Sequence, residues 1–137
     1  MLAFLAMVLL APPLRADGGK ADVRVTQQGE AFVVEATFEA PVPHALAWEV
    51  LTDFEQMDHF VPNLADSRIV AREGQKLTIL QHGVAKFGPL SFRFESVRVV
   101  TLMPPEAIRS VQTRGTMKKL ESTTTFVAAG SGTQLRY

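Results

Sequence analysis

The chain has 137 residues, of which 47% are hydrophobic and 20% charged, so its length and composition fit one globular domain and exclude a disordered chain. Its 14 basic and 14 acidic residues give a formal net charge of zero, which argues against a nucleic-acid-binding protein. The absence of cysteine excludes disulfides, thiolate metal sites and cysteine nucleophiles.

The first fourteen residues, MLAFLAMVLLAPPL, are uncharged and include Pro12 and Pro13. A helix of that length spans about 21 Å, less than the ~30 Å hydrocarbon core of a bilayer. The segment therefore favours a secretory signal peptide, residues 1–16, cleaved after Ala16, over an uncleaved anchor. The protein is then expected to be periplasmic or secreted.

The small, polar start of the mature chain predicts a flexible lead-in over residues 17–29, followed by one domain over residues 30–137. From Phe32 apolar and polar residues alternate, with Val34 and Phe38 on one face. This period of two predicts a half-buried strand.

A helix is predicted after Pro43, because Ala47, Val50, Leu51 and Phe54 fall at helical spacing on one face. A second short helix is predicted over residues 55–60. The remainder reads as six strands separated by Gly and Pro turns, over residues 66–72, 76–87, 90–102, 107–114, 117–128 and 133–137. Contiguous strands with short turns predict an α+β fold, a curved antiparallel sheet with two short helices after the first strand.

This order of elements carries several short motifs. They are Pro41-Val42-Pro43 at the end of the first strand, Asp53-Phe54, Met57, Phe60-Val61-Pro62, and Gly130-Ser131-Gly132-Thr133 before the last strand. In order and spacing the chain resembles the START-like (SRPBCC) superfamily, whose fold is the helix-grip, and within it the polyketide cyclase and coenzyme Q-binding START branch.

The resemblance implies an apolar pocket between the sheet and the helices. It also implies a long C-terminal helix closing the sheet, whereas this chain ends at Tyr137 inside the last predicted strand. The domain over residues 30–137 is therefore expected to be C-terminally truncated.

The expected ligand-binding residues are mostly aromatic or apolar, together with one histidine that could offer a polar contact inside the cavity. They are Trp48, Phe54, Met57, Phe60, Ile79, His82, Phe92, Phe94 and Phe126. The alternative for the aromatic residues is ordinary core packing, and for His82 a place on the surface.

No catalytic residue, metal ligand or cofactor is predicted. His44, His59 and His82 contain no i, i+4 pair that would bind a metal. Asp53, Glu55 and Asp58 fit a solvated helix face better than an acid–base pair.

The leading hypothesis is an exported binding module that holds a hydrophobic small molecule: a lipid, quinone or polyketide-like ring system. Two alternatives stay open. One is an aromatase/cyclase-type enzyme that moves a proton through His82 or Tyr137; the other is an assembly protein whose open sheet face takes a partner helix. The expected partners are a hydrophobic small molecule or lipid, and no nucleic acid. Transient membrane contact and the oligomeric state stay open.

Overall fold

The structure, a computed structural model, describes residues 21–137. The predicted signal peptide, residues 1–16, lies outside the described residues. In chain order the elements are β1 (Ala21–Gln28), β2 (Ala31–Ala40), α2 (His44–Thr52), the 3-10 helix η1 (Phe54–Gln56), α3 (Met57–Phe60), β3 (Leu64–Glu73), β4 (Lys76–Phe87), β5 (Leu90–Met103), β6 (Ala107–Gly115), β7 (Glu121–Ala129) and β8 (Gly132–Arg136).

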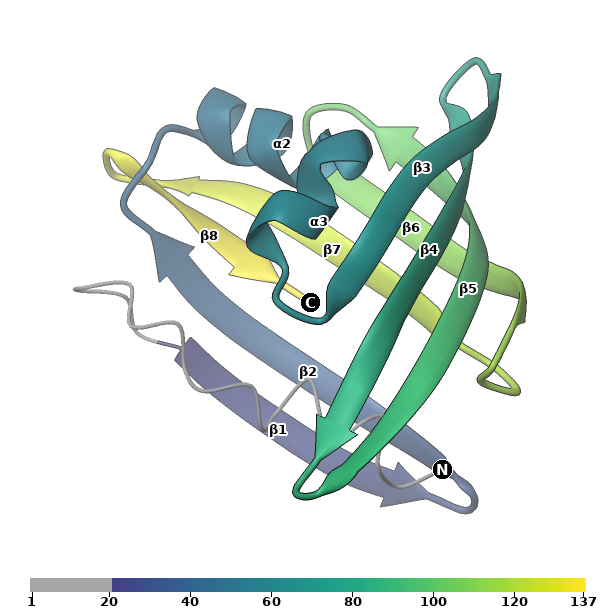
Figure 1. The fold of residues 1–137 in the computed structure, drawn as a ribbon. Helices are drawn as coiled ribbons and strands as arrows, with labels where there is room; N and C mark the ends of the chain where they lie inside the picture. The colour runs from purple at the N-terminus through teal and green to yellow at the C-terminus, as the bar shows by residue number, and fades with distance from the viewer. Residues whose placement is uncertain (1–20) are drawn as a thin grey trace.

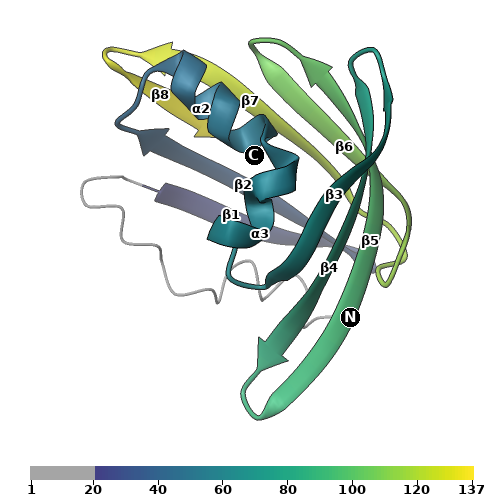
Figure 2. The ribbon, with the colours of Figure 1, turned by 45° about the horizontal axis from the view of Figure 1, so that its top comes forward.

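The eight strands form one antiparallel sheet in the order β1-β2-β8-β7-β6-β5-β4-β3. The sheet curves around α2 and α3, which lie on its concave face (Figure 1). The helix α2 contacts β7 and β8, whereas η1 and α3 contact β3. Seen from above, the helices occupy the space between the two arms of the curved sheet (Figure 2).

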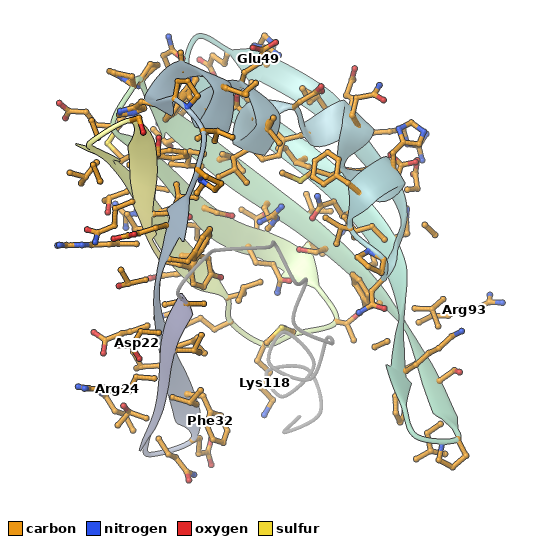
Figure 3. The ribbon with its side chains drawn as sticks, turned by 90° about the vertical axis from the view of Figure 1, so that its left-hand side faces the viewer. Asp22, Arg24, Phe32, Glu49, Arg93 and Lys118 are labelled. Carbon is orange, nitrogen blue, oxygen red and sulfur yellow. The ribbon has the colours of Figure 1, made fainter. Side chains whose placement is uncertain are left out.

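The helices cover only one end of the concave face. At the other end, the β1–β2 hairpin with Phe32 and the β4–β5 hairpin with Arg93 extend on opposite sides of a region that none of the helices within residues 21–137 covers (Figure 3). Within residues 21–137 none of the helices has the length and apolar character needed to cross a membrane.

The N-terminal part of the domain differs from the prediction. Residues 21–28 of the expected lead-in form β1, which pairs with β2 in the register Val25↔Val34. β1 ends at Gln28, and the tight hairpin turn that follows begins at Gly29, which has a φ of 62°. The helices therefore follow the second strand of the sheet, not the first.

The helix α2 packs through a narrower stripe than predicted. Ala47, Trp48 and Leu51 belong to or pack against the buried core, whereas Val50, expected on the same face, is 45% exposed. The helix meets the sheet along positions i, i+1 and i+4, so position i+3 turns to solvent. The helix begins directly after Pro43, as predicted, and the Pro43 carbonyl oxygen accepts a hydrogen bond from the Ala47 N–H at 3.1 Å.

Six strands follow the helices, as predicted. The one clear shift in their bounds is at β7, which begins at Glu121 and not at residue 117. The loop before β7 is held by Gln112, whose side-chain Nε2 donates to the Met117 carbonyl oxygen at 2.6 Å.

Candidate ligand-binding cavity

A cavity of about 410 Å³ lies between the helices and the concave face of the sheet. Its apolar wall comes from β1 and β2, the helical segment, and β5 and β6, through Val23, Val34, Ala36, Phe38, Leu51, Phe54, Met57, Val100 and Ile108. Its polar wall consists of Arg98, Ser110, Ser122, Thr124 and Tyr137. A mostly apolar cavity with a few polar groups is typical of a small-molecule site.

Strand alternation explains which residues reach the cavity. Every second residue of β2 points to the concave face, so Val34, Ala36 and Phe38 line the cavity together. In β7 the same alternation brings Ser122 and Thr124 to the cavity, while Thr123 between them is exposed.

Arg98 is the single charged residue in this wall. Its Nη2 donates to the Gln81 side-chain oxygen at 2.8 Å, and its Nη1 donates to Ser110 Oγ at 3.2 Å. Its Nε is enclosed and has no hydrogen-bond partner among the described residues. Burial lowers the pKa of the guanidinium, and a Coulomb interaction with Tyr137 acts in the opposite direction.

Within residues 21–137 the ion pairs involve other residues, so no carboxylate lies within 4.0 Å of Arg98. A charged side chain removed from water usually has an ionic partner. The hydrogen-bond partners of Arg98 are therefore neutral, and its Coulomb interaction is with Tyr137.

A chain of hydrogen bonds holds Arg98 in position. Gln81, which accepts from Arg98, donates through Nε2 to Ser67 Oγ at 3.0 Å. Ser67 in turn donates to the Phe54 carbonyl oxygen, which connects β3, β4 and β5 to the helical segment. Gln81 and Ser67 are buried, at 6% and 4% exposure. Their hydrogen bonds leave Arg98 little freedom to turn away from the cavity.

Of the nine residues predicted to bind a ligand, Phe54 and Met57 line this cavity. Three others belong to the packed core. Ile79 is fully buried, and Phe126 is 3% exposed with its ring 5.2 Å from that of Trp48 in an edge-on arrangement. Neighbouring protein atoms cover Ile79 and Phe126, and Trp48 is partly buried against the same core.

The other four predicted residues lie elsewhere. Phe60 and Phe92 are 44% and 48% exposed and are not part of the cavity wall. Phe94 lines a smaller hollow of about 130 Å³, on the side of Arg98 toward Met117. The placement of His82 needs a separate correction.

His82 lies on the convex face of the sheet, outside the cavity. Its Nε2 is 3.1 Å from Glu95 Oε2 and its Nδ1 is 3.5 Å from Asp66 Oδ2. Ile79 and Gln81 occupy the concave face of the same strand, so residue 82 must point to the opposite side. A polar contact inside the cavity is therefore supplied by Arg98, and not by His82.

Arg98 and Gln81 were missed as candidates, although the sequence contains a signal for them. Alternation along β4 groups Gln81 with the apolar Leu77 and Ile79, and alternation along β5 groups Arg98 with Val100. A long polar side chain on an otherwise apolar strand face marks either an irregular strand or a polar group directed into the interior. Among residues 21–137, no group of His, Asp or Glu is arranged to hold a metal ion.

Comparison with known proteins identifies the family. Residues 40–137 match the model of a family described as polyketide cyclase / dehydrase and lipid transport. The chain belongs to this family. The curved antiparallel sheet with short helices on its concave face is the helix-grip fold predicted from the sequence. No curated protein matches the sequence at a significant level.

Solved structures share the fold at low sequence identity. The STAR-related lipid transfer protein from Xanthomonas axonopodis is 17% identical over 89% of this chain and 75% of its own, with a TM-score of 0.67. The Zhui aromatase/cyclase from Streptomyces sp. R1128 is 18% identical over 84% and 65%, with a TM-score of 0.63. A START superfamily protein from Mycobacterium smegmatis is 20% identical over 74% and 70%, with a TM-score of 0.60.

Proposed function

We propose that this domain binds a hydrophobic small molecule, such as a lipid or a polyketide-like ring system, in the cavity between helices and sheet. The observation that carries the proposal is a cavity of about 410 Å³ with nine apolar wall residues and a small polar group around Arg98. That volume lies in the usual range for small-molecule sites, about 300–1,000 Å³. Membership of a family that includes lipid transport supports the same conclusion.

Neighbouring threonines on opposite faces of β7 allow a matched test. Thr124 lines the cavity and Thr123 is exposed. Thr124→Phe adds an aromatic ring to the cavity, whereas Thr123→Phe adds the same ring to the outer face. Both variants keep a residue that favours strands.

We expect the wild type and Thr123→Phe to bind the uncharged fluorescent probe N-phenyl-1-naphthylamine with similar affinity. Thr124→Phe should bind it about tenfold or more weakly, because a filled cavity offers less apolar contact. Fluorescence titration measures this. Equal binding by all three proteins would place the probe outside the cavity, and no binding by the wild type would refute the proposal.

An aromatase/cyclase-type enzyme is the second candidate. The observation that favours it is the group of N–H and O–H donors in the wall, from Arg98, Ser110 and Tyr137, which can hold the oxygens of a poly-keto chain. His82 cannot move the proton from the convex face, so Tyr137 is the remaining candidate of the two. Tyr137→Phe should abolish cyclisation of a poly-β-keto thioester and retain probe binding; wild-type protein that forms no cyclised product would exclude this candidate.

We also propose that the domain is exported and acts in the periplasm or outside the cell, on the basis of the uncharged apolar stretch at residues 1–14. Expressed with that stretch in a bacterium, the protein should be recovered from the periplasm with Asp17 as its first residue. Leu9→Arg with Leu10→Arg interrupts the apolar stretch and should keep the protein full-length in the cytoplasm. Cytoplasmic retention of the unaltered chain would overturn the proposal.

A further inference from the structure

We propose that the ligand of this cavity carries one anionic oxygen group, a carboxylate, on an apolar body, and that Arg98 binds this group. The inference rests on the proposed function and names the chemical class of the ligand. Three features carry it: the absence of an Asp or Glu side chain beside Arg98 among residues 21–137, the hydrogen bonds around the guanidinium, and the apolar wall formed by β1 and β2.

In the described part of the chain Arg98 forms no ion pair with an Asp or Glu side chain, and its Coulomb interaction is with Tyr137 of the same wall. Arg98 is the single charged side chain of the wall, and among residues 21–137 no Asp or Glu lies within 4.0 Å of it. Removing a guanidinium from water without an ionic partner is unfavourable, and an anion that enters the cavity relieves this cost. A neutral ligand would bury the charge further and leave it uncompensated.

The hydrogen bonds of Arg98 hold the side chain in position but do not use all of its N–H donors. A guanidinium has five N–H donors, and two of them bind Gln81 and Ser110. The Nε donor is enclosed and unpaired in the described part of the chain. The fork of an arginine matches the two oxygens of a carboxylate, so the remaining N–H groups of Nη1 and Nη2 suit this group better than a single carbonyl.

Gln81 and Ser67, which hold Arg98 in position, are not part of the cavity wall. Gln81 accepts from Arg98 and donates to Ser67, which donates to the Phe54 carbonyl oxygen. These groups are already paired, so they hold the guanidinium in place and offer a ligand little else. The opposite wall, from Val34 to Phe38, is apolar on its inner face. One anionic end and an uncharged apolar body therefore match the two walls.

The test compares two probes of equal chain length, decanoate and 1-decanol, by displacement of N-phenyl-1-naphthylamine at neutral pH. The variant is Arg98→Met, which keeps an unbranched apolar stem and removes the guanidinium with its charge. Arg93→Met is the matched control, because Arg93 is an exposed arginine on the same strand, outside the cavity wall (Figure 3). Arg98→Lys keeps the charge and removes the fork.

We expect wild type and Arg93→Met to bind decanoate about 10- to 100-fold more tightly than decanol, the range of a charge-assisted hydrogen bond. Arg98→Met should lose this preference and still bind the uncharged probe, and Arg98→Lys should keep part of it. Unchanged thermal unfolding of the variants shows that they fold.

Equal affinity of the wild type for the two probes would overturn the inference, as would a preference for decanoate that survives in Arg98→Met. Either result leaves the proposed function standing, because the apolar probe still binds. Failure of the wild type to bind N-phenyl-1-naphthylamine, decanoate or decanol would refute the proposed function itself.

Discussion

Gly83 in β4 occupies a point where the backbone is approached on one side by two other groups. A Cβ atom there would overlap the Asn63 carbonyl oxygen and the ring of Phe94. The same Asn63 oxygen accepts a hydrogen bond from the Val84 N–H at 3.0 Å, so it cannot move without losing that bond. The glycine thus lets the segment after α3 pack directly against β4.

Gly83→Ala should lower the free energy of unfolding by about 2–3 kcal/mol, the upper part of the usual range for overpacking, because backbone must shift. Gly74→Ala is the matched control: Gly74 has a φ of 57° and open space around it, so its loss should stay near the ~1 kcal/mol expected for left-handed backbone. Urea denaturation measures both. A smaller loss for Gly83→Ala than for Gly74→Ala would contradict this account of the site.

His82 was expected inside the cavity and lies outside it. His82→Ala should leave the affinity for N-phenyl-1-naphthylamine unchanged, because the side chain contacts Asp66 and Glu95 on the convex face. The loss in stability should be at most about 1 kcal/mol, since the pairs are partly exposed. Met57→Ala, in the cavity wall, should weaken probe binding. Loss of probe binding in His82→Ala would contradict the assignment of this cavity as the binding site.

His82 shows what the alternation of residues along a strand can predict and what it cannot. The pattern correctly placed His82 on the face opposite Ile79. Assigning a polar role in the cavity then required knowledge of which face is concave, and two-residue periodicity cannot supply it. The same pattern grouped Gln81 with Leu77 and Ile79, and this grouping was the usable signal for the interior polar cluster.

The helix α2 is held on the sheet by an aromatic cluster. The ring of Phe126 in β7 lies 5.2 Å from that of Trp48, edge-on, and 5.9 Å from that of His44, stacked. Such pairs contribute about 0.5–1.5 kcal/mol beyond the area they bury. Phe126 thus anchors the helix to the sheet, although the sequence suggested that it contacts a ligand.

Phe126→Ala should lower the free energy of unfolding by about 3–5 kcal/mol, because it removes a ring that is 3% exposed and leaves a cavity. Phe60→Ala, at a ring that is 44% exposed, should lose less than half as much. Chemical denaturation followed by circular dichroism measures both. Similar losses for the two variants would mean that Phe126 does not anchor the helix.

Element prediction succeeded where apolar spacing was regular and failed where it was not. The strands from β3 to β8 follow alternation and Gly or Pro turns, which are local properties of the chain. β1 was missed because its residues are all exposed and its partner β2 determines its place in the sheet. Local sequence carries little information on a strand that is stabilised mainly by hydrogen bonds to a neighbour.

At the scale of the whole molecule, the cavity lies between elements far apart in sequence, from Val23 in β1 to Tyr137 after β8. A ligand there contacts the sheet and the helical segment together, so it binds the folded state and not the unfolded chain. Decanoate at 100 times its dissociation constant should stabilise the domain by about 2.7 kcal/mol.

For a domain of this size, that stabilisation corresponds to a rise in Tm of roughly 5–20 °C, which differential scanning fluorimetry with an external dye can measure. Thr124→Phe should show a smaller rise at the same ligand concentration, because Thr124 lines the cavity. An equal rise in both proteins would indicate that the stabilising ligand binds elsewhere.

The sequence by itself determined the fold class, the order of the helices and of the six strands that follow them, and the apolar inner faces of those strands. These properties follow from periodicity and turn residues within short segments of chain. The tertiary structure alone decided that Phe54 and Met57 meet Val34, Phe38 and Arg98 around one cavity. Curvature of the sheet and packing of the helices bring these residues together, and such long-range geometry is not encoded in any single segment.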